Sequence, residues 1–366
     1  MTDRFADLRR VARDLGTDAV ALVPGPNFTR ALGQSFGSNE RPFLLVIGAD
    51  GRDAAIVPNL ELDSWAQTGF EGQTFDWRDQ DGYAEAFAGL AAQFPMTSLA
   101  VEGQGMRVFV HHALMAAYPG LDIRDGEKAI SGLRAIKTEA DIAALEAAIA
   151  ISEAALRDTL DAVRVGMTET EVEEKLVQAL FAHGADSLSF PPIVAAGDNS
   201  ALPHAHARAD YRIREGDPLL IDFGARKRGF AADITRTVFV GTPSEEGRAV
   251  YDAVLRANEA ALSATRAGAT AHEVDDAATS VLEASPYADR IRTKTGHGLG
   301  REVHEMPYIM RGNHQPLQAG MVYTDEPGLY QVGAFGVRIE DVVLVTEDGC
   351  RVLTTFPKDL TIVGHA

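Results

Sequence analysis

Residues 218–240 read PLLIDFGARKRGFAADITRTVFV, two apolar runs joined by a short charged turn. Apolar runs separated by so few residues predict an antiparallel β-hairpin. Each arm carries one acid within its apolar run, Asp222 on the first arm and Asp233 on the second. With the turn centred on Lys227 and Arg228, these acids become direct cross-strand neighbours. Because two such carboxylates repel each other and are costly to bury, a cation between them is the natural remedy.

Two later segments place further polar groups in apolar or glycine-bounded settings. In the stretch TGHGLG, glycines on both sides of His297 allow the backbone to approach closely whatever the imidazole contacts. The stretches DEPGLY and VRIED contain Glu326 and Glu340, and Val337–Val345 reads as one strand. This pattern predicts a second hairpin with an acid on each arm.

Each of these residues, taken alone, has a structural explanation. A single acid in a strand is more often salt-bridged or beside a turn, a lone histidine is usually a core residue, and Glu-Pro-Gly can simply start a turn. The triplet His204-Ala205-His206 is only a weak indication of a paired metal ligand. The combination of four carboxylates and one histidine instead favours two divalent ions about 3.5–4 Å apart that share carboxylates. Oxygen-rich donors favour manganese or cobalt, with zinc or iron also compatible.

The chain divides into two parts with different patterns. Over residues 1–128, strand-like runs alternate with alanine-rich helical stretches, which predicts an α/β domain that ends near an Asp-Gly turn. Over residues 129–366, a few long helices are interleaved with runs of strands, which predicts an α+β domain with a largely antiparallel sheet. Thr138, Thr168 and Thr270, each followed three residues later by an acid, predict three helix starts.

Composition narrows the function classes. Against 34 basic residues stand 53 acidic ones, for a formal charge of −19, which disfavours binding to nucleic acid or to an anionic membrane surface. No apolar run approaches the roughly 20 residues that span a bilayer. The first 15 residues do not resemble a signal peptide, and the single cysteine, Cys350, fits a reducing compartment. We therefore expect a cytoplasmic protein.

These motifs resemble those of the pita-bread metallopeptidases, which include Xaa-Pro aminopeptidases, prolidases and methionine aminopeptidases. The resemblance covers about residues 130–366, and its motifs are Leu220–Gly224, Asp233–Arg236, His297–Gly300, His304–Pro307, Glu326–Tyr330 and Arg338–Asp341. Pro24–Phe28 and Arg41–Gly48 are similar to the small creatinase-like α/β domain of the proline-directed members, which methionine aminopeptidases lack. The resemblance implies an α+β pita-bread catalytic domain over 129–366, a smaller α/β N-terminal domain over 1–128, and a homodimer.

The resemblance also implies a ligand set and a reaction. Asp222 would bind one ion, Asp233 and Glu340 would bridge both ions, and His297 with Glu326 would complete the second. A hydroxide bridging the two ions would attack the peptide bond preceding proline in small peptides with proline at the second position. Such an enzyme is an Xaa-Pro aminopeptidase or an Xaa-Pro dipeptidase.

Four more residues match family positions around the substrate. His204 and His304 would hydrogen-bond to the scissile carbonyl or the developing oxyanion. Glu326, besides its ligand role, would transfer a proton to the leaving nitrogen. Arg338 would orient Glu340 or its neighbours beside the substrate, and Phe190 would line the pocket for the proline ring.

Two departures from the family pattern and two alternatives complete the sequence-based expectation. Asp325 precedes Glu326 where the family usually has an apolar residue, and strand alternation favours an outward-pointing side chain. Some dipeptidases have an arginine after the His-Glu-x-Pro segment that can cap the substrate carboxylate, where this chain has Tyr308, with Arg311 one turn away. The same metal site acting on a small non-peptide metabolite is one alternative. A non-catalytic binding module is the other.

Overall fold

The computed structural model describes residues 3–37 and 40–364, and the chain forms two compact units, Met1–Arg134 and Ala135–Ala366. The predicted domain boundary at residue 128 falls within the last helix of the first unit, α6 (Glu127–Gly132). Each unit is described by itself. Among the helices of the described residues, none is long and apolar enough to cross a membrane.

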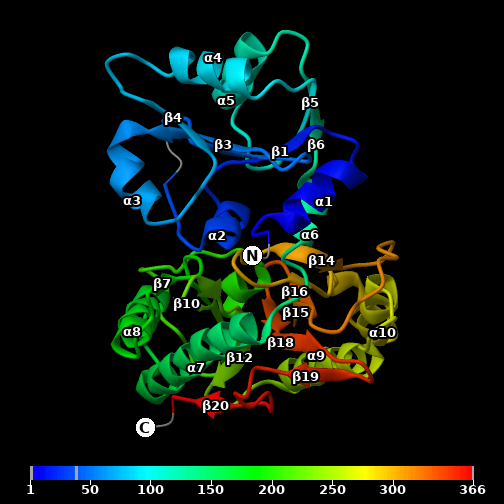
Figure 1. Cartoon of the computed structure of the whole chain (residues 1–366). Coiled ribbons are helices and arrows are strands. Elements are labelled where there is room, and N and C mark those ends of the chain that lie inside the picture. The colour runs from blue at the N-terminus through cyan, green and yellow to red at the C-terminus, as the bar shows by residue number, and fades with distance from the viewer. Residues whose placement is uncertain (1–2, 38–39, 365–366) are drawn as a thin grey trace. The chain divides into compact units, whose positions relative to one another are not determined.

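The first unit is built around a six-stranded mixed sheet with the strand order β4-β3-β2-β1-β5-β6, and helices pack against it (Figure 1). Its strands are β1 Ala19–Leu22, β2 Leu44–Gly48, β3 Asp53–Pro58, β4 Gln73–Trp77, β5 Ser98–Val101 and β6 Asp122–Asp125. Its other helices are α1 Ala6–Asp14, α2 Pro26–Leu32, α3 Leu62–Ala66, α4 Ala84–Gln93 and α5 Val108–Ala117. The α/β class predicted for this part of the chain is confirmed.

Both faces of this sheet are apolar, because successive strand residues point to opposite sides. Ala19 and Ala21 pack with the face covered by α4 and α5, through residues such as Leu114. Val20 and Leu22 pack on the other face, with residues of α1, α2, α3 and α6. The four inner strands, β3, β2, β1 and β5, therefore read as largely continuous apolar runs without alternation, as is typical of a sheet covered on both sides, whereas the edge strands β4 and β6 are more polar.

The second unit combines four helices with several small sheets. Its helices are α7 Glu139–Ala162, α8 Glu169–Ala182, α9 Glu245–Ala264 and α10 Ala271–Glu283. The strands before α9 are β7 Ser187–Leu188, β8 Ile193–Ala196, β9 Asp217–Phe223, β10 Ala225–Lys227, β11 Phe230–Ala231 and β12 Ile234–Val240. Those after α10 are β13 Gly296–Gly298, β14 Glu305–Ile309, β15 Val322–Asp325, β16 Gly328–Gln331, β17 Phe335–Arg338, β18 Asp341–Val345, β19 Cys350–Val352 and β20 Ile362–Val363.

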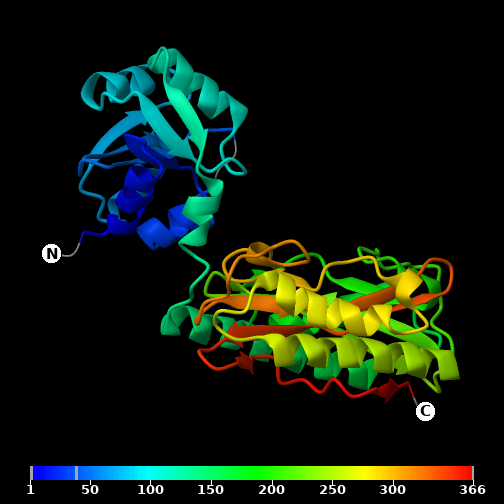
Figure 2. The same ribbon diagram turned by 90° about the vertical axis from the view of Figure 1, so that its right-hand side faces the viewer.

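Two sheets carry the core of this unit. The orders are β20-β12-β9-β8 and β14-β13-β15-β18-β19. Apart from the parallel β12–β20 pair, the described strand pairs of these two sheets are antiparallel, as predicted. Side chains of α7 and α8 pack mainly with the first sheet, and those of α9 and α10 mainly with the second. In Figure 2, α9 and α10 lie side by side, yellow-green and yellow.

The predicted helix starts are confirmed. Thr138, Thr168 and Thr270 each accept a hydrogen bond from the backbone of the third helical residue, whose acidic side chain bonds back to the cap. These reciprocal bonds satisfy backbone donors that would otherwise lack partners at the first turn. The helices therefore begin where local side-chain chemistry places them.

Candidate metal centre

The structure brings the five predicted ligand residues together within the second unit. Their side chains form overlapping groups whose ligand atoms lie within 4.8 Å of one another, and these groups are Asp222–Asp233–Glu340, His297–Glu326–Glu340 and Asp233–His297–His304. Asp222, Asp233, His297 and Glu340 are buried, and Glu326 is half-buried. Asp233, His297 and Glu340 each belong to two groups, and of these three the carboxylates Asp233 and Glu340 have two oxygens each with which to bridge two ions.

The first hairpin is antiparallel as predicted, but each arm is divided into two strands, β9 and β10 on the first and β11 and β12 on the second, and the register differs. Asp222 is opposite Thr235, whereas direct pairing with Asp233 was predicted, so that prediction is wrong by two residues. The turn is centred on Arg228 and Gly229, which both have positive φ, 51° and 78°, as a two-residue type I′ hairpin turn requires. Because residues two apart share a face of a strand, Asp233 still lies on the same side as Asp222, as a diagonal neighbour.

The second hairpin is interrupted where it carries its acids. β15 pairs with β18, and β16 pairs with β17, so Val337–Val345 is not the single strand that was predicted. Glu326 and Glu340 lie in the breaks between these pairs. The Glu326 N–H donates to the carbonyl of Thr295 at 2.7 Å, and the Glu340 N–H donates to the carbonyl of Thr235 at 3.1 Å. The breaks turn both side chains out of the ladder and toward the cluster.

The glycines around His297 are required by close backbone contacts. A Cβ atom at Gly296 would lie 1.6 Å from the carbonyl oxygen of Thr324, and one at Gly298 would lie 2.2 Å from that of Met306. Larger residues at either position would force β13 away from its neighbours. The predicted crowding of the backbone at this histidine is thus confirmed.

One nitrogen of His297 faces the carboxylates. Nε2 lies 3.2 Å from Oε1 of Glu326 and 3.7 Å from Oδ2 of Asp233. Nδ1 lies 3.2 Å from the carbonyl oxygen of Gly298, so a proton on Nδ1 would be donated there. That tautomer leaves the Nε2 lone pair free for a cation, the usual arrangement of a metal-binding histidine.

Burial and mutual repulsion make the acidic groups costly to ionise. Burial raises the pKa of Asp233 and that of Glu340 well above the usual range, and the neighbouring carboxylates raise both pKa values further. Burial also raises the pKa of Asp222, although the nearby Arg338 opposes that effect. Burial acts in the same direction on Glu326, but the hydrogen bond with His297 and the nearby positive charges of His297, Arg338 and Lys294 together outweigh it, so the pKa of Glu326 is lowered.

The donor set fits a divalent cation. Oδ1 of Asp222 is buried, and no described residue gives it a hydrogen bond. A buried carboxylate oxygen without a partner costs free energy that a bound ion would remove. Carboxylate oxygens with one imidazole nitrogen are ligands for manganese, cobalt, zinc or iron. The residues present therefore fit the metal ions predicted from the sequence.

Arg338 and Thr235 connect the ligand residues to each other. The Arg338 guanidinium donates to Oδ2 of Asp222 at 2.5 Å, to the hydroxyl of Tyr330 at 2.8 Å and to Oγ1 of Thr235 at 3.0 Å. The Thr235 hydroxyl in turn donates to Oε2 of Glu340 at 2.6 Å. Arg338 thus contacts Asp222 directly and reaches Glu340 through Thr235, a residue that the sequence analysis did not single out.

A cavity of about 710 Å³ opens beside the cluster. It is lined by the five predicted ligand residues and by the predicted Phe190, His204, His304 and Arg338. Further residues that the sequence did not indicate also line it: Ile193, Pro203, Arg292, Thr293, Lys294, Val303 and Met310. These additional residues come mostly from irregular segments, which have no periodicity to reveal them. Besides His297 and Arg338, the cavity therefore has an apolar wall, two histidines and two cationic side chains beside an acidic centre.

His304 lies against the ligand histidine. The ring centroids of His304 and His297 are 3.9 Å apart. Burial and the adjacent His297 lower the pKa of His304 to about 4, so its imidazole is neutral at pH 7. A neutral imidazole at the edge of the cavity can donate one N–H to a substrate oxygen.

Two departures noted in the sequence are placed by the structure. Asp325 does not point outward: it is fully buried, on the side of its strand opposite the cluster, so that expectation is wrong. Asp325 points away from Glu326 because successive strand residues alternate sides. The side to which it points is covered by α9 and is therefore core. Arg311 forms ion pairs with Asp276 and Glu283, and it is not among the residues that line the cavity.

Buried carboxylates and an imidazole beside an open cavity form the kind of site that holds divalent ions in metal-dependent hydrolases. Two family models cover most of the chain, "Metallopeptidase family M24" over residues 143–347 and "Creatinase/Prolidase N-terminal domain" over residues 4–136. The chain belongs to metallopeptidase family M24, and the predicted pita-bread fold with its creatinase-like N-terminal domain is confirmed.

Three similar proteins cover nearly the full length of the chain. The "Xaa-Pro dipeptidase" of Lactobacillus helveticus is 32% identical over 97% of this chain and 98% of its own length. The solved structure of the Xaa-Pro dipeptidase from Bacillus anthracis has a TM-score of 0.90 at 29% identity and covers 98% of this chain and 99% of its own. That of the X-Pro aminopeptidase from Thermotoga maritima has a TM-score of 0.83 at 30% identity, with coverages of 97% and 98%.

Proposed function

We propose that this metallopeptidase hydrolyses the peptide bond preceding proline in small peptides, with two divalent metal ions held by Asp222, Asp233, His297, Glu326 and Glu340. The observation that carries the proposal is that these five side chains, with His304, form three overlapping clusters, one of which contains the unpaired Oδ1 of Asp222. The names of the similar proteins, Xaa-Pro dipeptidase and X-Pro aminopeptidase, support the choice of bond.

The five ligand residues would be divided between the two ions. Asp222 would bind one ion, His297 and Glu326 the other, and Asp233 and Glu340 both, in keeping with the groups to which each belongs. When bound, the two cations would lower the pKa of water toward neutrality and polarise the scissile carbonyl. Manganese or cobalt suits the oxygen-rich donor set best.

The surrounding residues would bind and orient the substrate. His204 and His304 line the cavity and would donate to the carbonyl oxygen as negative charge develops on it, a contribution of about 3 kcal/mol for one good donor. Phe190 would contact the proline ring, and Glu326 would deliver a proton to the leaving nitrogen. Arg338 would hold Asp222 in place through their 2.5 Å contact.

The resemblance further supports a homodimeric, cytoplasmic enzyme, and the single cysteine agrees with a reducing compartment. Sedimentation or light scattering of the purified protein tests the first point, since a dimer doubles the 39.2 kDa mass of the chain.

The test combines metal removal with a substrate panel. Protein stripped with a chelator should lose activity and regain it with Mn²⁺ or Co²⁺, on Xaa-Pro dipeptides or longer Xaa-Pro peptides but not on Ala-Ala. Asp233→Asn should abolish activity, whereas Asp348→Asn, at an exposed acid, should leave it unchanged. A metal-reconstituted enzyme that leaves every Xaa-Pro peptide intact would contradict the proposal and favour a non-peptide substrate.

A further inference from the structure

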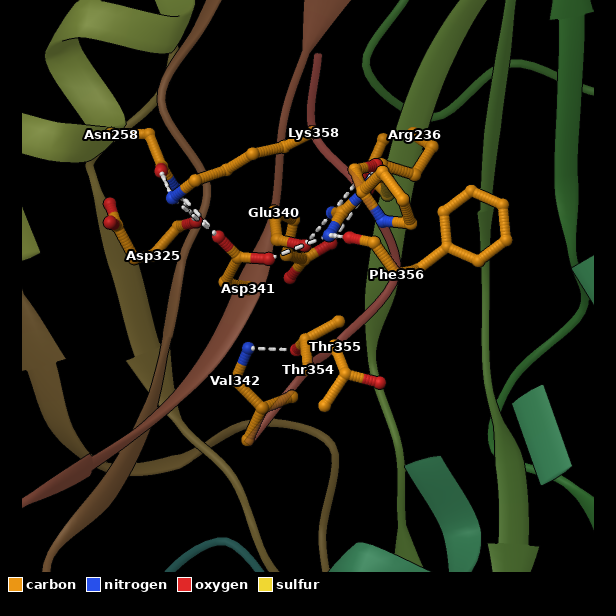
Figure 3. Close-up of polar contacts among 12 residues, drawn as sticks. Arg236, Asn258, Asp325, Glu340, Asp341, Val342, Thr354, Thr355, Phe356 and Lys358 are labelled. Atoms are coloured by element: carbon orange, nitrogen blue, oxygen red, sulfur yellow. Dashed lines mark hydrogen bonds and ion pairs between the residues drawn. The ribbon is translucent and has the colours of Figure 1, made fainter. Parts of the chain in front are cut away.

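A second polar network lies beside Glu340, at the start of β18 (Figure 3). Its centre is Asp341, whose side chain is 2% exposed. Oδ1 of Asp341 accepts from Arg236 at 2.8 Å, and Oδ2 accepts from Lys358 at 3.2 Å and from Asn258 at 3.4 Å. Asp341 therefore lies between two cations that reach it from different parts of the chain.

Arg236 links this network to the backbone of Glu340. Its Nη1 donates to the carbonyl oxygen of Glu340 at 2.6 Å and to that of Thr235 at 3.0 Å. Nη2 and Nε donate to the carbonyl oxygens of Phe356 and Pro357 at 2.7 and 3.0 Å. Together with the bond to Asp341, these contacts use the five N–H donors of a guanidinium that is buried.

The partners of Arg236 and Asp341 include a segment after β19 that we term the C-terminal clamp, residues 354–358. Thr354 accepts from the Val342 N–H at 2.7 Å, which fixes the start of the clamp against β18. The Phe356 N–H donates to Glu153 of α7 at 2.8 Å. The Lys358 ammonium closes the other end by donating to Asn258 of α9 at 2.6 Å. The clamp is thus anchored to both helix pairs of the second unit.

Glu340 depends on such support because it lies outside the strand ladder. It follows β17 and precedes β18, so its peptide is fixed by the bonds to Thr235 and Arg236 already described. Two carboxyl groups, Asp325 and Asp341, are buried on the side of the sheet that α9 covers. Arg236 and Lys358 are the cations in contact with Asp341.

We propose that the C-terminal clamp positions the bridging ligand Glu340: Lys358 fixes Asp341, Asp341 fixes Arg236, and Arg236 fixes the Glu340 backbone. Lys358 and Arg236 are then positioning residues that touch neither metal nor substrate. The inference rests on the proposed function only in assigning Glu340 as a metal ligand. Partners that orient ligands in this way change metal affinity by about 10- to 100-fold when they are lost.

Lys358 is the member best suited to substitution, because its side chain is 27% exposed while those of Arg236 and Asp341 are buried. Lys358→Met removes the charge and the hydrogen bonds, and Lys358→Arg keeps both. Lys227→Met is the matched control, since Lys227 is 30% exposed and pairs with Asp186 at 2.8 Å in the same unit, away from the network.

The readout is Mn²⁺ binding to the metal-free protein, measured by calorimetry, with the spin coupling of the bound Mn²⁺ pair followed by electron paramagnetic resonance. We expect Lys358→Met to weaken binding of the lower-affinity Mn²⁺ ion about 10-fold and to reduce the resonance signal of the spin-coupled pair. Lys358→Arg and Lys227→Met should stay within threefold of wild type. Lys358→Gln serves in place of the Met variant if that protein does not unfold cooperatively.

Other outcomes overturn the inference. A purely structural role would lower the melting temperature and leave the Mn²⁺ affinity unchanged. A purely electrostatic role would tighten Mn²⁺ binding, because a positive charge has been removed. Wild-type protein that binds Mn²⁺ but hydrolyses no Xaa-Pro peptide would contradict the proposed function alone. Wild-type protein that binds no Mn²⁺ would contradict both.

Discussion

Thr235→Val tests whether one buried hydroxyl organises the metal centre. The side chain is 0% exposed, and its Oγ1 donates to Glu340 and accepts from Arg338. Valine has nearly the same shape but neither hydrogen-bonding function, so each partner loses one bond in a buried site. Each loss costs about 1–3 kcal/mol of stability. Since Glu340 and, through Arg338, Asp222 lose orientation together, we expect Mn²⁺ affinity to fall about 10- to 100-fold.

Thr237→Val is the matched control. Thr237 is also buried on the same strand, but among the described residues its hydroxyl bonds to backbone groups of Arg338 alone, at 2.9 and 3.1 Å. Both variants should therefore lose similar stability in chemical denaturation of the metal-free protein, whereas calorimetry should show weakened metal binding only for Thr235→Val. Equal Mn²⁺ affinities in the two variants would refute the role assigned to the Thr235 hydroxyl.

Three further predictions concern protonation and substrate contact. Burial raises the folded-state pKa of Asp325 well above 3.8, so the unfolding free energy of the metal-free protein should fall as pH rises above about 4. In denaturant titrations, Asp325→Asn should make the unfolding free energy less dependent on pH and raise it by about 1–3 kcal/mol at pH 8. Because the pKa values of Asp233 and Glu340 are raised, Mn²⁺ binding at pH 6 should release protons, and calorimetric enthalpies that do not depend on the buffer would contradict this. His304→Ala should lower kcat about 100-fold with unchanged metal content. Because the pKa of His304 is about 4, this residue does not titrate between pH 6 and 8, so His304→Asn should leave the shape of the kcat/KM profile in that range unchanged.

The parts of the site that sequence predicted are those with local signals. The acids at 222 and 233 stand out because each interrupts an apolar run of sequence, and the glycines around His297 mark a backbone that neighbouring segments of the same chain approach closely. Helix starts such as Thr138 were predictable because a capping box is formed by residues three apart. In each case the physical cause lies within a few residues of its effect.

What sequence missed depends on geometry that no short stretch records. The hairpin register differed because Arg228, an ordinary residue, adopts positive φ beside Gly229 and moves the turn centre by one position. Asp325 alternates away from the metals as expected, but whether that side is solvent or core depends on a helix about 60–80 residues earlier in the chain. Lys358 reaches Asp341 from a segment without a motif or periodicity.

The central claim is that five side chains bind two metal ions, and crystals grown with excess Mn²⁺ test it through anomalous scattering at the manganese edge. Two peaks about 3.5–4 Å apart are predicted, one contacted by Asp222 and the other by His297 and Glu326, with Asp233 and Glu340 contacting both. Crystals that show one peak or none at these residues, with Mn²⁺ present in solution at saturating concentration, would contradict the account.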